Sequence, residues 1–159
     1  MPDTVTRMQV EQYVYFALKS HRTPAADMTA FLGIEPDEVV VRGSKRASPA
    51  RPVVHAWQVA CREPGRRVDE QAACVLARLV PHTARIADLA RRLDAEAEDG
   101  MGSAVLEVVR CLRPAGDTPP VANLLGWCLD RGALAFLTAT GASLDVDEYD
   151  MTPAPDEEL

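Results

Sequence analysis

The stretch QYVYFALKS, residues 12–20, alternates between large apolar side chains and a second set that is mostly tyrosine or polar. The apolar set is Val14, Phe16 and Leu18. Because successive side chains of a strand point to opposite faces, this spacing predicts a β-strand with one face buried in a core. Tyr13 and Tyr15 then lie on the opposite face, and what covers that face decides both the fold and the candidate site.

The segments after this strand alternate between helical and extended patterns. Helices are predicted over residues 23–33, over 69–93 and from Asp130 to Gly141, and Pro81 is expected to kink the second helix or to split it in two. Further strands are predicted over residues 37–43, 53–61, 104–112 and 141–150. The resulting order is β-α-β-β-α-β, followed by one more helix and one more strand.

This order matches the ferredoxin-like arrangement, in which helices pack on one face of an antiparallel sheet. We therefore predict an α+β fold with a ferredoxin-like core, an added C-terminal helix and strand, and a mainly antiparallel sheet. A chain of 159 residues has the usual size of one domain. That domain is expected over residues 11–150, after a flexible N-terminus (1–10) and before a disordered acidic tail (151–159).

The charge of the chain argues against nucleic-acid binding. A formal net charge of −7 opposes the counterion release that drives binding to phosphate backbones. Basic residues are nevertheless concentrated between residues 42 and 67, namely Arg42, Lys45, Arg46, Arg51, Arg62, Arg66 and Arg67. The loop 43–52 within this region is either a solvated basic loop or a site for an anion.

Cysteine spacing and the length of apolar runs indicate the compartment. Cys61, Cys74, Cys111 and Cys128 form no CxxC pair and have no neighbouring histidine, which is typical of free buried thiols rather than a zinc site. No segment resembles a signal peptide or reaches the length of a membrane span. These features predict a protein of the reducing cytoplasm without membrane contact.

Several segments carry a family resemblance. YVYFALKS, TAFLGIEP, VVVRG and above all GWCLDRGALAFLTATGASLDVDEYD resemble the bacterial domain of unknown function DUF4279, over roughly residues 12–150. Its recurring positions correspond here to Glu35, Pro36, Gly43, Trp57, Gly141, Asp145, Asp147 and Tyr149. Glu148 departs from the pattern, which has an apolar residue at that place. The resemblance implies a compact domain and no assigned activity.

The second face of the sheet is the candidate working surface. If the first and third strands are central, Tyr13 and Tyr15 are expected beside His55 and Trp57, on a face that the helices leave open. The candidate binding residues are Tyr13, Tyr15, His55, Trp57, Asp145, Asp147 and Tyr149. Three alternatives stand for this face: the C-terminal unit covers it, two copies of the chain pack on it, or it binds a ligand or a partner protein.

The acidic strand near the C-terminus does not predict catalysis. Asp145 and Asp147 share a face with Tyr149, whereas Glu148 points the other way. Two carboxylates are too few to hold Mg²⁺ or Ca²⁺, and one strand cannot place an acid–base pair on opposite sides of a bond. Motifs such as GxSxG and HExxH are absent, so no catalytic residue, metal site or cofactor is predicted.

These features favour a binding or protein-interaction module without catalysis of its own. One version is an immunity-type protein whose acidic surface neutralises a basic toxin domain. The alternative is a small-molecule enzyme of the dimeric α/β-barrel kind, in which His55 and Trp57 line a cavity between facing sheets and Tyr15 donates a proton. A third interpretation is a structural subunit of a larger assembly. The expected partner is another protein or a second copy, bound through the aromatic face of the sheet.

Overall fold

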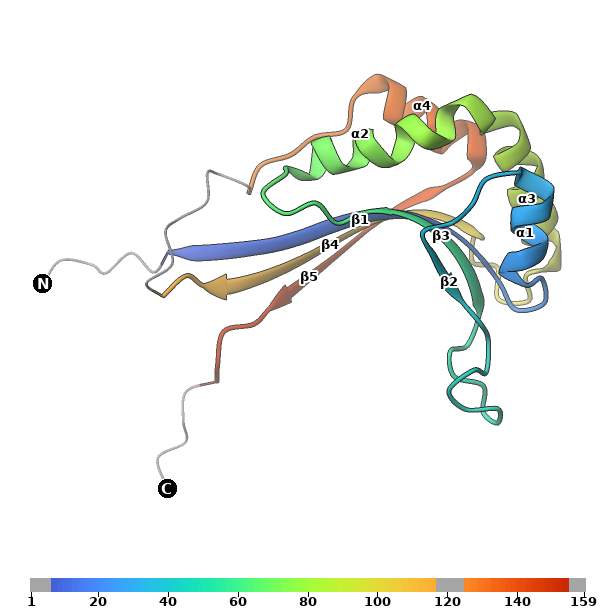
Figure 1. The fold of residues 1–159 in the computed structure, drawn as a ribbon, viewed down its shortest axis with the longest axis horizontal. Coiled ribbons are helices and arrows are strands. Elements are labelled where there is room, and N and C mark those ends of the chain that lie inside the picture. The colour runs from blue at the N-terminus through green and yellow to red at the C-terminus, as the bar shows by residue number, and fades with distance from the viewer. Residues whose placement is uncertain (1–6, 117–124, 155–159) are drawn as a thin grey trace, which may run out of the picture.

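A single five-stranded sheet organises the computed structural model, which describes residues 7–116 and 125–154 (Figure 1). The strands are β1 (Met8–Ser20), β2 (Glu38–Val40), β3 (His55–Cys61), β4 (Ala104–Pro114) and β5 (Ser143–Asp150). The helices are α1 (Ala25–Leu32), α2 (Val68–Leu79), α3 (Thr83–Glu96) and α4 (Arg131–Thr140), with a short 3-10 helix, η1 (Val80–His82), between α2 and α3.

The strands lie in the order β2-β3-β1-β4-β5. The central strand β1 is antiparallel to β3 on one side and to β4 on the other, and β5 runs parallel to β4 at the edge. The prediction of an α+β fold with a mainly antiparallel sheet is therefore confirmed. The five-stranded order differs from the four-stranded ferredoxin-like sheet by β5, which extends the sheet beyond β4.

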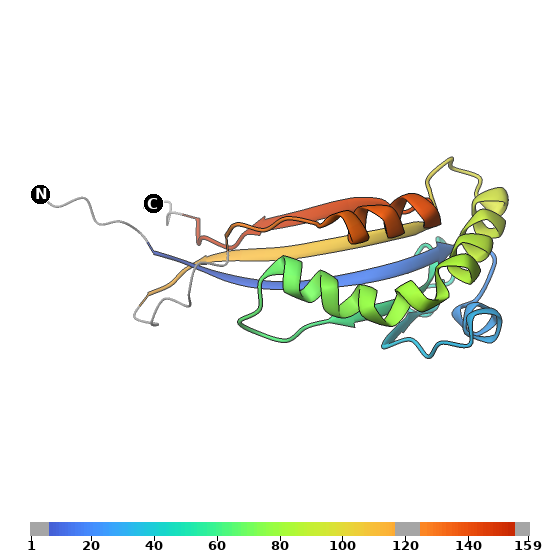
Figure 2. The same cartoon turned by 90° about the horizontal axis from the view of Figure 1, so that it is seen from above.

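The helices form one layer on one face of the sheet. Figure 1 shows α2 and α4 along this face, with α1 and α3 closing one end, and Figure 2 shows α2 and α4 side by side over the strands. The core lies between the two layers and contains Phe16, Trp57 and Leu106, with the ring of Phe136 from α4 edge-on to that of Phe16. Among the described residues, no helix lies on the other face of the sheet.

Local sequence signals explain most of the helix boundaries. The side chain of Asp130 accepts a hydrogen bond from the backbone N–H of Ala133 at 2.8 Å, which caps α4. Gly141 ends that helix in the left-handed conformation, at φ 67°. Pro81 separates α2 from α3, as its missing N–H requires. Both ends of α4 and the split at Pro81 were predicted.

Two predicted helix starts are shifted by one or two residues. Pro24, rather than Thr23, is the N-cap residue of α1, and the Thr23 hydroxyl donates instead to Glu96 Oε2 at 2.7 Å. Asp69 was expected to cap the second helix but lies in its first turn, where a carboxylate interacts favourably with the helix dipole. The N-cap residue of α2 is Arg67.

The ends of the chain lie partly outside the described residues. Residues 8–10, expected in a flexible N-terminus, belong to β1 because they pair with β4, while residues 1–6 lie outside the described part. In the predicted acidic tail, residues 151–154 are in neither helix nor strand, and residues 155–159 are not described. Within the described ranges, the structure contains no helix of the length and apolarity that crossing a bilayer requires.

Candidate functional site

The face of the sheet that carries no helix is the candidate site, and we call it the open face. Strand register places Tyr15, Glu107 and Asp145 in one row across β1, β4 and β5, and Tyr13 and Asp147 in the next row. The C-terminal unit does not cover this face, because β5 joins the edge of the sheet and α4 lies on the helix side (Figure 1). The first of the three alternatives for this face is thereby excluded.

Five of the seven predicted site residues lie on the open face: Tyr13, Tyr15, Asp145, Asp147 and Tyr149. His55 and Trp57 do not, and their expected place beside the tyrosines is wrong. The register pairs Trp57 with Leu18 and His55 with Ser20, and partners in a ladder share a face. Trp57 is 0% exposed in the core. The Nδ1 atom of His55 accepts a hydrogen bond from the backbone N–H of Arg42.

Three carboxyl groups meet on the open face where β4 pairs with the edge strand β5, and we call them the carboxylate cluster. Glu107, Asp145 and Asp147 each place an oxygen within 4.8 Å of the other two. The Lys19 ammonium lies 3.7 Å from Glu107 Oε2 and partly balances their charge. A group of this kind can share a proton, accept hydrogen bonds from a guanidinium or ammonium group, or provide oxygen ligands for a metal ion.

Burial makes Glu107 the unusual member of the cluster. It is only 6% exposed although no helix covers it. Desolvation raises the pKa of Glu107; the Tyr15 hydroxyl opposes this by donating to the carboxylate, whereas the nearby Asp147 adds to it. The pKa of Tyr15 is raised in turn, first by burial and then by its bond to Glu107. Tyr15 therefore stays protonated and acts as a hydrogen-bond donor.

The tyrosines border the cluster on two sides. The rings of Tyr13 and Tyr15 stack with centroids 6.2 Å apart, and the guanidinium carbon of Arg62 lies 4.0 Å from the centroid of the Tyr13 ring. Tyr149 is 50% exposed at the other edge, and the charge of Asp147 raises its pKa. The open face thus combines exposed aromatic surface with negative charge, and it already accommodates one arginine of its own chain.

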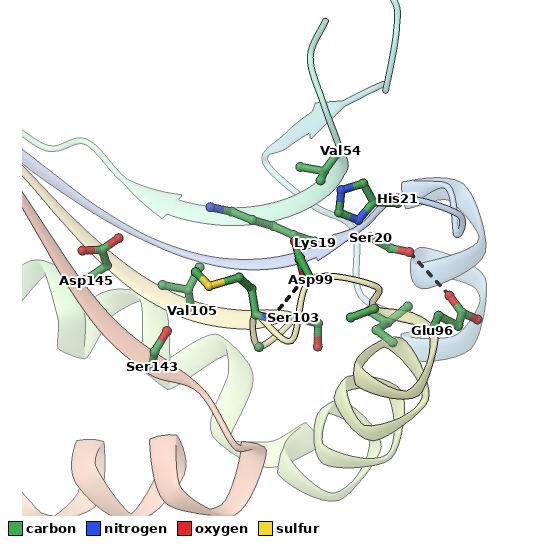
Figure 3. A pocket seen from close by; sticks show the side chains of 14 residues that line it. Lys19, Ser20, His21, Val54, Glu96, Asp99, Ser103, Val105, Ser143 and Asp145 are labelled. Carbon is green, nitrogen blue, oxygen red and sulfur yellow. Dashed lines mark hydrogen bonds between the residues drawn. The ribbon is translucent and has the colours of Figure 1, made fainter. Parts of the chain in front are cut away.

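A pocket of about 230 Å³ adjoins the cluster at the end of the sheet. Lys19 and Asp145 line it on the sheet side, while Met101 and Asp99 come from the loop that precedes β4 (Figure 3). The Ser20 hydroxyl and Glu96 Oε2 join β1 to α3 at the rim, 3.5 Å apart. The pocket extends the open face and offers apolar as well as charged surface.

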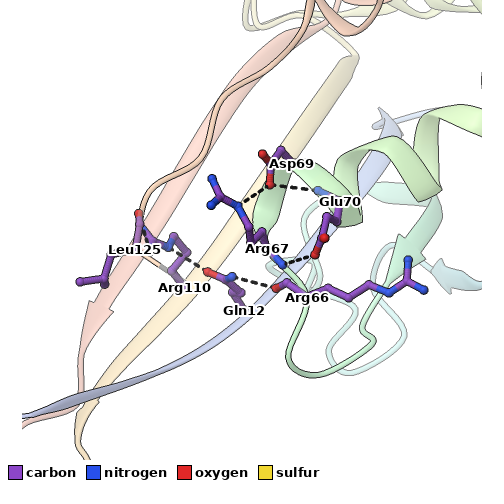
Figure 4. A network of polar contacts seen from close by, with 7 residues as sticks. All are labelled: Gln12, Arg66, Arg67, Asp69, Glu70, Arg110 and Leu125. Carbon is purple, nitrogen blue, oxygen red and sulfur yellow. Dashed lines mark hydrogen bonds and ion pairs between the residues drawn. The ribbon is translucent and has the colours of Figure 1, made fainter. Parts of the chain in front are cut away.

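A polar network on the helix side holds β5 and its acidic residues in place. Arg110 is 5% exposed, and its Nε donates to Gln12 Oε1 at 3.1 Å while one terminal nitrogen donates to the Leu125 carbonyl at 3.2 Å (Figure 4). Another terminal nitrogen lies 3.9 Å from the carboxylate of Glu148. The Glu148 side chain is about half exposed as well as close to this cation, and both features allow a charge at a position where the family resemblance has an apolar residue.

Sequence reasoning missed three charged residues of the open face. Glu107 is the one carboxylate in the apolar run AVLEVVRCL, and two-residue alternation places it with Val105 and Val109. Alternation within β1 does place Lys19 on the face of Tyr13 and Tyr15. Its contact with Glu107, and that of Arg62 with Tyr13, could not be predicted, because each joins strands that are distant in the sequence. A lone charge in an apolar strand was the signal that could have revealed Glu107.

Replacing Glu107 with glutamine is expected to change how stability depends on pH. The folded state holds the pKa of Glu107 above its ordinary value of 4.5, so folding favours the protonated form. The contribution of Glu107 to the free energy of unfolding is therefore fully present at low pH and is lost as pH rises through the pKa that this group has in the folded protein. The loss is about 1.4 kcal/mol for each pKa unit between the folded and the unfolded state. E107Q should be more stable than the wild type at pH 8 and equal to it below about pH 4.

Urea unfolding of both proteins across this pH range measures the difference. Because Asp37 and Asp150 have lowered pKa values and titrate in the opposite sense, only the difference between the two proteins isolates Glu107. A wild-type protein that is more stable than E107Q at pH 8 would contradict the prediction, because it would mean that the pair with Lys19 outweighs the desolvation of Glu107.

Comparison with known proteins gives one match. The family model described as domain of unknown function (DUF4279) matches residues 9–151, nearly the whole of the described chain. Searches of the curated proteins and of the solved structures give no match. The match also covers every residue of the open face named above, and the chain belongs to the DUF4279 family.

Proposed function

We propose that this protein is a protein-binding module whose open face receives a basic segment of a partner, without catalysis of its own. One observation carries the proposal: the sheet face on which the described residues form no helix holds three carboxyl groups along β4 and β5, with three tyrosines beside them. A nucleophile beside a general base would be needed for covalent catalysis. The Tyr15 hydroxyl does lie beside the Glu107 carboxylate, but the raised pKa of Tyr15 opposes the loss of its proton.

The chemistry of the open face fits arginine and lysine side chains. Carboxylates form charge-assisted hydrogen bonds with guanidinium groups, and tyrosine rings attract cations through their faces. The guanidinium of Arg62 over Tyr13 shows the second of these contacts within the chain. The excess of negative charge, −7 over the chain, adds attraction at longer range for a basic partner.

Titration with a synthetic peptide of alternating arginine and serine tests the proposal. Amide chemical shifts of the labelled protein should change on β1, β4 and β5, and a glutamate–serine peptide of equal length should change none of them. The double variant D145N/D147N should bind the basic peptide about tenfold more weakly, equivalent to about 1.4 kcal/mol. Affinity should also fall as salt is raised.

A matched variant separates the open face from net charge alone. D27N/E35Q also removes two negative charges, from exposed positions on α1 and just after it. Its affinity for the basic peptide should stay within about twofold of the wild type. Equal losses in the two double variants, or shifts spread over the helix side, would contradict the proposal.

The proposed basic partner is a toxin domain, and the chain is its immunity protein in a bacterial cytoplasm. Inhibition of a toxin encoded beside the gene would support this assignment, whereas a gene neighbourhood without a toxin gene would overturn it.

The proposed ancestry of the sheet is that its first four strands correspond to a ferredoxin-like core, to which β5 was added. The pairing of β1 with both β3 and β4 supports that relationship.

A second copy of the chain is the other candidate occupant. The loop 41–54, which we call the basic arm, extends on the side of the sheet away from α2 and α4 (Figure 1). It exposes Arg42, Lys45, Arg46 and Arg51. If two open faces pack on each other about a two-fold axis parallel to β1, opposite edges of the two sheets meet. The basic arm, at the β2 edge of one copy, then lies over β5 at the edge of the other copy. Light scattering at micromolar concentration distinguishes a second copy from a different protein as the occupant of the open face. A dimer favours the second copy, and a monomer excludes it.

The structure weakens the alternative of a dimeric α/β-barrel enzyme, because two of the three residues expected in its cavity do not lie on the open face. His55 and Trp57 lie on the helix side and cannot line a cavity between two open faces. Tyr15 alone is on the open face, with a raised pKa that opposes proton release.

A further inference from the structure

The outer edge of β5 has no strand partner among the described residues. β5 (Ser143–Asp150) is the last strand in the order of the sheet and runs along its edge (Figure 2). It is eight residues long, whereas β2 at the opposite edge has only three. A free edge of this length can accept a further strand through its backbone N–H and C=O groups.

The ladder between β4 and β5 decides which backbone groups of β5 face outward. The backbone N–H of Met151 donates to the Leu112 carbonyl at the end of this ladder, at 2.8 Å. Backbone groups of every second residue point to the same side, so Asp145, Asp147 and Tyr149 also turn their N–H and C=O groups toward β4. The residues whose backbone groups turn outward are therefore Leu144, Val146, Glu148 and Asp150.

We propose that a basic segment of a partner protein adds to this edge as a sixth strand of the sheet, antiparallel to β5. The inference rests on the proposed function of the open face and specifies how the partner binds there. In such a pair, the residues opposite Asp145 and Asp147 occupy the positions without hydrogen bonds, where facing side chains come closest. Arginine or lysine at those positions would lie beside the carboxylate cluster.

The charge of β5 selects a basic segment as the occupant of its edge. The strand carries four carboxylates, on Asp145, Asp147, Glu148 and Asp150, and no basic residue. Pairing of two copies of β5 would bring like charges together, which destabilises a ladder. A segment with cations at every second position has the complementary charge. Its intervening uncharged side chains would lie on the helix side, beside Leu144, which is 42% exposed.

Hydrogen exchange of the labelled full-length protein, with and without the arginine–serine peptide, tests the added strand. The amides of Val146 and Glu148 should exchange rapidly in the free protein and about tenfold or more slowly when the peptide is saturating. The amides of Asp145 and Asp147 should change much less, because they already bond to β4. A peptide that lay on the open face without joining the sheet would leave this alternation unchanged.

Two N-methylated forms of the peptide give a matched comparison. Antiparallel addition turns the N–H groups of the serines toward β5 and those of the arginines away from it. Methylation of the serine nitrogens should therefore weaken binding about tenfold or more, and methylation of the arginine nitrogens should change it less than about twofold. Equal effects of the two, or the reverse pattern, would overturn the antiparallel strand.

A pair of variants makes the same test on the protein. E148P removes one outward N–H, whereas E148Q removes the charge of the same residue and keeps that N–H. Proline is tolerated on an edge strand where its nitrogen faces solvent, so E148P should keep the wild-type circular dichroism spectrum. It should bind the peptide about tenfold more weakly than E148Q. Equal affinities of the two folded variants would contradict the proposal.

The two proposals fail in different ways. If D145N/D147N weakens binding but the outward amides keep their rapid exchange, the open face binds the basic segment without an added strand, and only the present inference is wrong. If the peptide does not bind, both proposals are wrong. Slow exchange of the outward amides in the free protein, together with a dimer in light scattering, would mean that a second copy occupies the edge and would also overturn the inference.

Discussion

Replacing Trp57 with alanine is expected to lower the free energy of unfolding by about 3–5 kcal/mol. The indole is the largest fully buried side chain and packs in the core beneath the helices. Its removal loses the transfer free energy of an aromatic side chain and leaves a cavity that a close-packed core fills only in part. Urea denaturation followed by circular dichroism measures the change.

Two variants make this prediction specific. Y149A truncates an exposed aromatic residue on β5 and should change the free energy of unfolding by less than about 0.5 kcal/mol. W57F should cost only about 1–2 kcal/mol, because the indole N–H of Trp57 has no hydrogen-bond partner among the described residues and phenylalanine removes that buried donor. Similar losses for W57A and Y149A would show that Trp57 is not in the core.

R110A is expected to lower the free energy of unfolding by about 2–4 kcal/mol. The substitution removes the donor that Gln12 Oε1 and the Leu125 carbonyl share, and it removes a buried side chain from between the sheet and the segment that contains Leu125. Because Leu125 belongs to the segment that leads into α4 and β5, the loss should also loosen the carboxylate cluster. Hydrogen exchange of the β5 amides should increase more than that of β3.

Arg113 provides the control for charge on the same strand. It pairs with Glu11 at 3.2 Å, and both side chains are about half exposed or more. Surface pairs of this kind contribute roughly 0–1 kcal/mol, so R113A should be close to the wild type in stability and in exchange. If R110A and R113A behave alike, the buried network does not position β5.

The fold could be predicted where local physics decides it. Alternation of Val14, Phe16 and Leu18 identified β1, and the Asp130 cap with Gly141 identified α4. The extension of β1 back to Met8 and the parallel pairing of β5 with β4 could not be predicted, because they depend on strands that are distant in the sequence. Strand register is set by such tertiary pairing.

The candidate site was predicted in part for the same reason. Alternation within β5 correctly separated Asp145, Asp147 and Tyr149 from Glu148. Within β3 it correctly grouped Trp57 with Val59, but that group was assigned to the wrong face of the sheet. Tyr13 and Tyr15 keep their hydroxyls on the open face, whereas the larger apolar surface of Trp57 is buried in the core. The aromatic residues therefore divide by polarity, which the alternation alone does not show.

The central place of β1 has a consequence for biosynthesis. It is translated before every other strand, and β3 can pair with it as soon as β3 itself has emerged from the ribosome. Its other side pairs with β4, which is made only after α2 and α3. Until β4 is made, the nascent chain exposes an unpaired edge of β1. An exposed edge of this kind can form non-native strand pairs or aggregate. Docking of β4, which closes a long loop, should govern how fast the newly made protein leaves that state.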